Sequence, residues 1–341
     1  MKDIHFKNIL LKNNSQVKSI SIVGLEKNTG KTETLNYVIK KINKTIGITS
    51  IGIDGESVDQ VTTTPKPEIE IKEGTIFATA ERFYKQKRFT SEILSIEDDL
   101  RTSIGRIVIA KALERGKIIL AGPQSSKKIK ILIERLTKLG SEIVLIDGAL
   151  SRLSPASPVI TDAMILATGA ALTLNINELV KKTKHIVNLI QLDESEISSE
   201  LNDLEDGIYA INDKIEKLPI NSLLSFDKLD KHILDYGNKI FLTGALTDRF
   251  LKHLSKQKNL SNVELIVKDF TKIFLTPETY NIYTKKGGKI KVLKKTNLIA
   301  ITINPYSPKG YMLNSQEIKN RLKEVIDLPI INVREDELWL N

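Results

Sequence analysis

Apolar residues along the first half of the chain alternate between short strand-like runs and stripes with helical spacing. Ser19 to Val23 is a short, mostly apolar run that predicts a strand buried on both faces. One face of a helix follows, at Leu35, Val38, Ile39 and Ile42. Ile46 to Ile53 predicts the next strand. Continued to about residue 192, this pattern predicts an α/β fold with a mostly parallel sheet that helices cover on both faces.

The stretch from residue 69 to residue 121 predicts a hairpin, a helix and another strand. Ile69 to Thr79 alternates as a β-hairpin broken at Gly74. Helical spacing follows at Ile109, Ala112 and Leu113. Gly116 is placed to end that helix, and Lys117 to Ala121 then predicts a short buried strand.

One more helix and one more strand complete this half of the chain. The helix is indicated by Ile129, Leu132, Ile133 and Leu136. It ends at Gly140, and the apolar strand Ile143 to Ile146 leads directly to Asp147. We expect this carboxylate at the carboxyl end of a parallel strand, which is where open α/β sheets bind ligands.

Beyond residue 192 the chain becomes acidic and polar, from Asp193 to Asp206. Such a stretch is typical of a hinge, so we expect a first domain over residues 1–192 and a C-terminal lobe over residues 193–341. Strands are predicted in that lobe at Lys239 to Leu242, Val263 to Val267 and Leu298 to Ile303, and a helix at Ile318, Leu322, Val325 and Ile326. The C-terminal part is therefore a second, smaller α/β lobe, expected to contact a partner or substrate. Its lysine-rich segment Lys285 to Lys295 predicts an edge strand shielded by lysines, with a binding patch as the alternative.

Composition narrows the class of protein. With 341 residues, 41% of them hydrophobic, the chain is long enough for large buried cores. The absence of cysteine excludes disulfides and thiolate metal sites. The N-terminus lacks an uninterrupted apolar segment, and no run approaches the roughly 18 apolar residues of a membrane span. We therefore expect a cytoplasmic protein that does not contact a membrane.

The net charge of +9 raises the question of nucleic-acid binding. The lysines are dispersed among acidic residues, and aromatic residues make up only 5% of the chain. Nucleic-acid surfaces gather basic residues on one face, and charge alone supplies only non-specific affinity. The composition therefore favours a solvated basic surface over nucleic-acid binding.

The segment Gly24 to Thr34, GLEKNTGKTET, joins the first strand to the first helix. The first N–H groups of a helix have no helical partner and its dipole favours negative charge, so this junction predicts a phosphate-binding loop. Gly30 lets the backbone approach phosphate, Lys31 neutralises the terminal phosphates, and Thr32 offers a hydroxyl to Mg²⁺. The residues expected to bind the nucleotide are Gly24, Lys27, Asn28, Thr29, Gly30, Lys31, Thr32 and Glu33.

The motif departs from the standard spacing at one position. The first glycine is expected at Leu25, and this chain has Gly24 one residue earlier. A helix start in a basic protein is the alternative interpretation. The strand before the motif and the helix after it favour the phosphate-binding loop.

A phosphate-binding loop requires a second element that fixes Mg²⁺, and Asp147 is the predicted metal ligand beside Thr32. Asp54, after the second strand, is the candidate to orient the attacking water, so Lys31 and Asp54 are the predicted catalytic residues. The polar loop Ser57 to Pro67 is either a switch that responds to nucleotide state or an ordinary crossover loop.

ATP with Mg²⁺ is the predicted cofactor. A guanine site normally carries an Asn-Lys-x-Asp sequence, whereas Asn212, Asp213 and Lys214 have the wrong order. ATP is therefore favoured over GTP.

The order of strand, GLEKNTGKTET, a strand ending in Asp54, and IVLIDGAL resembles the P-loop class that contains dethiobiotin synthetase and the partition ATPases. More specifically, GIDGES, KEGTIFATAE, and IDGALSRLSPAS followed by TDAMILATGAAL look like the small ATPase subunit of reactivating factors for cobalamin-dependent lysine and ornithine aminomutases. The resemblance covers about residues 19–172 and implies that Lys31, Thr32 and Asp147 bind nucleotide and Mg²⁺. It also implies a protein partner, either an aminomutase or a second reactivase subunit, and leaves homodimer formation open.

Three functions follow from these features. The first is an ATPase whose nucleotide state changes the conformation of a partner, as in the reactivation of a cobalamin-dependent aminomutase. The second is a small-molecule ligase or kinase similar to dethiobiotin synthetase, with Ser125, Ser126 and Lys127 lining a substrate pocket. The third is a basic binding module in which the nucleotide is incidental. We favour the first.

Overall fold

The computed structural model of the chain describes residues 17–52, 69–149, 160–220, 222–229, 233–258 and 260–334. The chain divides into two compact units. Unit 1 consists of the residues up to Lys184 together with those from Asn297 onward, and unit 2 consists of His185–Thr296. Each unit has its own sheet and its own hydrophobic core. Within these described ranges, no helix has the length and apolar composition needed to cross a bilayer.

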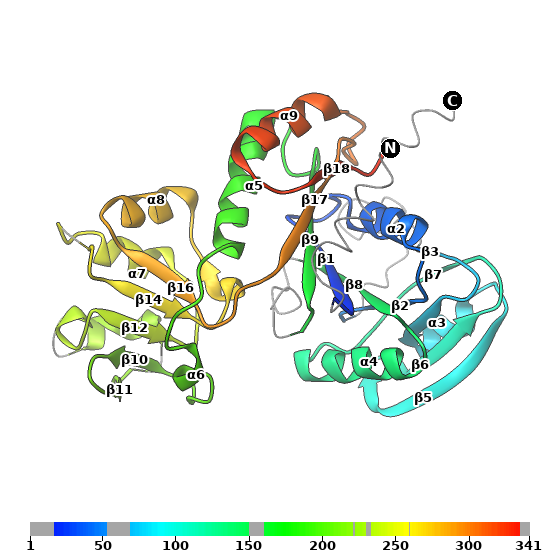
Figure 1. Ribbon diagram of the computed structural model, residues 1–341, viewed down its shortest axis with the longest axis horizontal. Coiled ribbons are helices and arrows are strands. Elements are labelled where there is room, and N and C mark those ends of the chain that lie inside the picture. The colour runs from blue at the N-terminus through cyan, green and yellow to red at the C-terminus, as the bar shows by residue number, and fades with distance from the viewer. Residues whose placement is uncertain are drawn as a thin grey trace. The chain divides into compact units, whose positions relative to one another are not determined.

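The described part of unit 1 is built on a nine-stranded sheet (Figure 1). In spatial order its strands are β18 (Ile330–Asn332), β17 (Leu298–Asn304), β9 (Ala163–Gly169), β1 (Ser19–Gly24), β8 (Ile143–Ala149), β2 (Ile46–Ser50), β4 (Ile76–Ala80), β6 (Gly105–Ala112) and β5 (Ser91–Thr102). Every neighbouring pair from β18 to β4 is parallel, whereas β4–β6 and β6–β5 are antiparallel. The predicted α/β fold with a mostly parallel sheet is confirmed.

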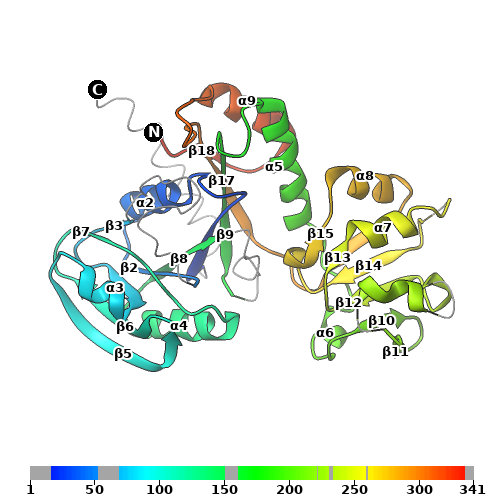
Figure 2. The same cartoon turned by 180° about the vertical axis from the view of Figure 1, so that it is seen from behind.

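Helices cover both faces of this sheet because its central strands are apolar on both faces. The buried stripe of α2 (Lys31–Lys41) shares one hydrophobic cluster with β1. The buried stripe of α4 (Ser126–Lys138) packs on the opposite face of the sheet (Figures 1 and 2). The helices α5 (Ile176–Ile190) and α9 (Ser315–Val325) follow β9 and β17 in the chain. Of the three helices predicted before β8, two are confirmed at these positions, as α2 and α4.

The hairpin predicted over residues 69–79 is wrong. β3 (Ile69–Ile71) pairs with β7 (Gly116–Ile118) in a separate two-stranded sheet, while β4 lies between β2 and β6 in the main sheet. The strand predicted over Lys117–Ala121 is therefore present only as the short β7, outside the main sheet. Alternation identified the strands but carried no information about which strands pair.

The helix predicted around Ile109 is also wrong, because that stretch is β6. Four consecutive residues of this strand, Ile107 to Ala110, are buried. A strand buried on both faces loses its alternation, so its apolar run also fits helical spacing.

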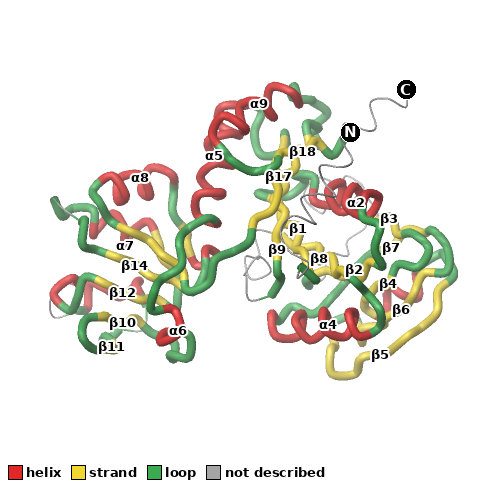
Figure 3. Tube along the Cα trace, viewed as in Figure 1, coloured by secondary structure: helices red, strands yellow, loops and turns green. Residues whose placement is uncertain are grey.

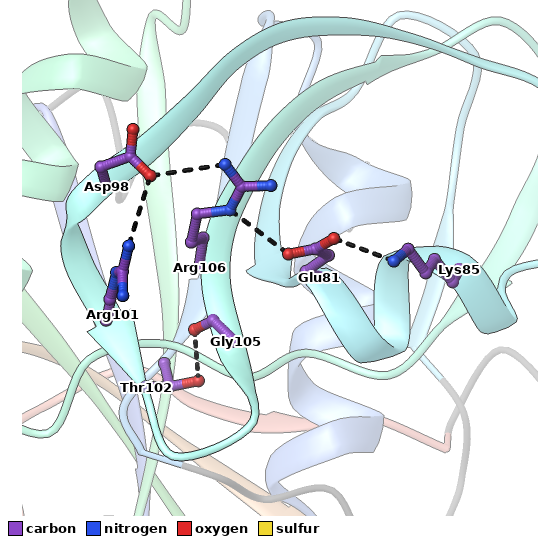
Figure 4. Close-up of polar contacts among 7 residues, drawn as sticks. All are labelled: Glu81, Lys85, Asp98, Arg101, Thr102, Gly105 and Arg106. Carbon is purple, nitrogen blue, oxygen red and sulfur yellow. Dashed lines mark hydrogen bonds and ion pairs between the residues drawn. The ribbon is translucent and has the colours of Figure 1, made fainter.

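Charged contacts hold the tip of the β5–β6 hairpin to α3 (Glu81–Gln86), as Figure 4 shows. Arg106 Nε lies 3.4 Å from Glu81 Oε2, and Arg106 Nη1 lies 3.4 Å from Asp98 Oδ1. Lys85 Nζ lies 2.9 Å from the other oxygen of Glu81. Hydrogen bonds from Lys85, with the larger effect, and from Arg106 lower the pKa of Glu81. The antiparallel end of the sheet is thereby joined to the short helix after β4.

Unit 2 contains a five-stranded sheet in the order β11 (Ile215–Lys217), β10 (Ile208–Ile211), β12 (Lys239–Leu242), β14 (Glu264–Val267) and β16 (Lys289–Val292). β12, β14 and β16 are parallel, and α7 (Asp248–Leu254) and α8 (Pro277–Lys285) connect them (Figure 3). Both helices pack on one face of this sheet. The strands predicted near Lys239 and Val263 are confirmed, and β16 is an edge strand, as the lysine-rich sequence predicted.

The shorter described elements of unit 2 lie between these strands. They are α6 (Ser198–Leu201), β13 (Leu246–Thr247), β15 (Ile273–Phe274) and the 3₁₀ helices η3 (Leu223–Lys228), η4 (Ile233–Asp235) and η5 (Phe270–Lys272). β13 and β15 pair with each other in parallel. The unit is thus α/β in its own right.

The division of the chain differs from the expected one. The strand predicted over Leu298–Ile303 exists as β17, but it pairs with β9 of unit 1 and not with a strand of unit 2. β18 pairs in turn with β17. Unit 2 is consequently an insertion within unit 1, shorter than the lobe expected over residues 193–341.

Candidate functional site

The loop between β1 and α2, residues 25–30, has a backbone suited to an anion. Asn28 and Gly30 adopt positive φ values of 61° and 96°. Gly30 is the N-cap of α2, and the N–H of Thr34 donates to Gly30 O at 2.9 Å. The N–H groups of Lys31, Thr32 and Glu33, before Thr34, have no acceptor within the helix. Left-handed residues beside a helix start form a concave set of N–H groups, which favours a negatively charged ligand.

The β1–α2 loop is fixed to neighbouring strands of the sheet. The N–H of Leu25 donates to Ala167 O of β9 at 3.0 Å. At the other end of the loop, the hydroxyl oxygens of Thr34 and Thr302, on α2 and β17, lie 2.7 Å apart. Both ends of the loop are therefore held by strands on the β9 side of β1.

Gly24, the last residue of β1, lies where the loop folds back on itself. A Cβ atom at Gly24 would lie 2.5 Å from Thr29 Oγ1 and 2.8 Å from Lys31 Cγ. The Thr29 hydroxyl donates to Glu26 O at 2.8 Å. A glycine at this position thus lets the Lys31 stem pack over the end of β1, which gives a physical reason for a glycine one residue before the standard position.

Asp147 lies on β8, directly beside β1. It pairs in register with Ile22 of β1 and with Ser50 of β2. Side chains alternate between faces along a strand, and Ile22 and Leu145 both belong to the cluster under α2. Asp147 is therefore on the α2 face of the sheet, and it is only 6% exposed. The sequence predicted a strand that stops at Ile146, just before Asp147. In the structure β8 continues to Ala149, so Asp147 lies inside the strand.

Two further polar residues end strands at the same edge and on the same face. Ser50 ends β2 opposite Asp147, and Asn304 ends β17. A Cβ atom at Gly30 would lie 2.6 Å from Asn304 Cβ, and one at Gly169 would lie 2.1 Å from Asn304 O. Sequence reasoning missed both residues, although each is a polar residue that closes an apolar strand, which is the signal that identified Asp147.

The first turn of α2 contains the remaining predicted residues. Lys31, Thr32 and Glu33 are all half-buried. Glu33 forms an ion pair with Arg334, whose Nη2 lies 3.2 Å from Glu33 Oε1. Lys27 is exposed at the outer part of the loop. The structure thus brings Gly24, Thr29, Gly30 and Lys31 together, with Lys27 at the rim.

Several predicted features lie outside the described residues. They are Asp54, the polar loop over residues 57–67, and the serine-proline segment over residues 151–157. The strand predicted to run to Ile53 is described as β2 and ends at Ser50.

The donor set fits a magnesium-bound polyphosphate. Lys31 and the first-turn N–H groups suit phosphate oxygens, while the Thr32 hydroxyl and the Asp147 carboxylate are oxygen ligands of the kind Mg²⁺ prefers. In the part of the chain that the structure describes, no three His, Cys, Asp or Glu side chains gather into a metal site. Mg²⁺ is commonly bound by one or two carboxylates together with phosphates and water, so a site of this kind does not require a cluster of three such side chains.

Comparison with models of known protein families finds no match for this chain, and comparison with curated proteins finds none either. Function is therefore inferred from the geometry of the site.

Proposed function

We propose that this chain is a cytoplasmic, Mg²⁺-dependent ATPase of the P-loop type, whose nucleotide state changes the conformation of a protein partner. One observation carries the proposal. The β1–α2 loop follows β1, and the buried Asp147 lies on β8, the parallel strand beside it. The helix α2 that the loop leads into and the Asp147 side chain are on the same face of the sheet, and the loop and Asp147 lie toward the same edge. Ligands of open α/β folds bind at this edge.

Each residue then has a defined task. Lys31 and the first-turn N–H groups of α2 bind the terminal phosphates, and Thr32 and Asp147 hold Mg²⁺. Mg²⁺ supplies positive charge that stabilises the charge developing on the phosphates during hydrolysis. Asp54, which follows β2 in the sequence, is the residue proposed to orient the attacking water.

Lys31→Ala tests the binding site directly. Loss of the ammonium beside the terminal phosphates should raise the Kd for Mg-ATP by at least about tenfold, measured by titration calorimetry. Lys40→Ala removes an exposed lysine from the last turn of the same helix and should leave this Kd unchanged. Equal ATP affinity in the wild type and in Lys31→Ala would contradict the assignment.

The proposed output is a conformational change in a partner, either a cobalamin-dependent aminomutase or a second reactivase subunit. A γ-phosphate with its Mg²⁺ can order the loops that surround it, and hydrolysis releases them. ATP turnover that increases on addition of a purified aminomutase supports this output. ATP turnover that such partners leave unchanged argues that the protein has a different output.

One observation favours the alternative of a small-molecule ligase or kinase. The N–H of Gly122 donates to Gly52 O at 3.0 Å, and the N–H of Gly52 donates to Pro123 O at 3.1 Å. These bonds hold the segment before α4 beside the carboxyl end of β2. Residues 125–127, at the start of α4, are then near the edge proposed for the nucleotide. ADP release that depends on an added amino or carboxylate metabolite would favour this function over the first.

A further inference from the structure

Glu33 places a negative charge in the first turn of α2, next to Thr32. Its side chain is 19% exposed, so water screens the charge only partly. A carboxylate beside a helix N-terminus is favourable in the absence of a ligand. When a polyphosphate binds to the same turn, however, the two negative charges repel each other.

Arg334 supplies the compensating charge from the other end of the chain. It follows β18, and its Nη2 lies 3.2 Å from Glu33 Oε1. The backbone N–H of Arg334 donates to Oδ1 of the buried Asn332 at 3.0 Å. The guanidinium also lies 5.8 Å from the centroid of the Tyr306 ring. These contacts fix the cation in place, unlike a pair of long side chains in solvent.

The segment that carries Tyr306 is itself connected to the β1–α2 loop. The N–H of Tyr306 donates to Asn304 Oδ1 at 3.2 Å, and Asn304 lies against Gly30. The surroundings of Arg334 therefore include the ends of β17 and β18 and the first turn of α2. The ion pair belongs to the edge of the sheet that holds the candidate site.

We propose that Arg334 is a positioning residue for nucleotide binding, which neutralises Glu33 so that the first turn of α2 accepts a polyphosphate. This inference rests on the proposed function. Without the guanidinium, the Glu33 carboxylate faces the bound phosphates uncompensated. Coulombic repulsion increases with the charge of the ligand, so the loss is greater for ATP than for ADP.

The experiment compares ATP and ADP affinity in the full chain by titration calorimetry. Arg334→Gln should raise the Kd for ATP about tenfold and the Kd for ADP by a smaller factor. Adding Glu33→Gln to Arg334→Gln removes the uncompensated charge and should restore the ATP Kd to within about threefold of the wild type. Arg334→Lys retains the charge and should bind ATP more tightly than Arg334→Gln does.

Arg115→Gln is the matched control, because it breaks an ion pair of similar length, 2.8 Å to Glu70, elsewhere in unit 1. It should leave both Kd values unchanged. An unchanged ATP Kd in Arg334→Gln, or a loss that Glu33→Gln does not rescue, overturns the role of Arg334 and leaves the proposed function standing. Absence of ATP binding by the wild type overturns both.

Discussion

At the scale of single residues, Asp147 carries the clearest chemical information. It is 6% exposed and is flanked in register by Ile22 and Ser50. Removing a carboxylate from water is costly, so buried carboxylates concentrate at sites where a cation or a reaction requires them. Its position beside β1 is the basis for proposing it as a Mg²⁺ ligand.

Asp147→Asn preserves the size of the side chain and removes its charge. If Asp147 holds Mg²⁺, this change should weaken ATP binding in the presence of Mg²⁺ by about tenfold and have little effect in the presence of a chelator. The measurement is the ATP Kd with and without Mg²⁺. Asp98→Asn, at a side chain that is 71% exposed on β5, is the control and should retain the wild-type Mg²⁺ dependence. The same dependence in Asp147→Asn would exclude a metal role.

The residues of the candidate site differ in how far the sequence predicted them. Lys31 and Thr32 belong to a motif of eleven consecutive residues, Gly24 to Thr34, which can be recognised from the local sequence alone. Asn304 lies far from that motif in the sequence and reaches Gly30 only because β17 pairs with β9. Strand order is a long-range property, so local patterns could not identify it.

At the scale of elements, helices with a polar face were predicted where they occur, whereas one buried strand, β6, was predicted as a helix. α2, α4 and α9 lie where apolar stripes indicated them, because a solvated face preserves the helical period. β6 shows the opposite case, since burial of consecutive residues removes the alternation of a strand.

The connection between α8 and β16 depends on Gly288. A Cβ atom there would lie 2.3 Å from Cζ of Tyr283, whose ring is fully buried. Gly288→Ala should therefore lower the free energy of unfolding by about 2 kcal/mol, because the ring or the turn must move. Urea denaturation of the full chain measures this change.

Gly244→Ala is the control in the same unit. An added Cβ at Gly244 meets no heavy atom within 4 Å. The free energy of unfolding should change by less than about 0.5 kcal/mol. Similar losses in the two variants would show that space beside Tyr283 is not what position 288 requires.

At the scale of the whole molecule, the order of elements in the sequence differs from their order in the sheet. β17 and β18 follow unit 2 in the chain and yet complete the sheet of unit 1. An apolar strand such as Leu298–Asn304 carries no local mark of the sheet it will join. The expected boundary at residue 192 therefore differs from the division at His185 and Asn297.

A chain truncated after residue 192 tests this division. It lacks β17, which leaves one edge of β9 without its partner and the first sheet incomplete. Such a chain should show no cooperative thermal unfolding by circular dichroism. A chain ending at residue 334 keeps every described element and should unfold like the full chain. Cooperative unfolding of the shorter chain would show that residues 1–192 form a domain by themselves.

The late position of β17 also has a consequence for synthesis in the cell. Chains begin to fold while the ribosome is still extending them, usually one domain at a time. Residues 185–296 emerge complete before the strands that close the surrounding sheet have been translated. The loop after β1 is made before this unit, but its contacts with Thr302 and Asn304 form only after residues 185–296 have been translated. The loop after β1 thus gains these contacts after the inserted unit can already have folded.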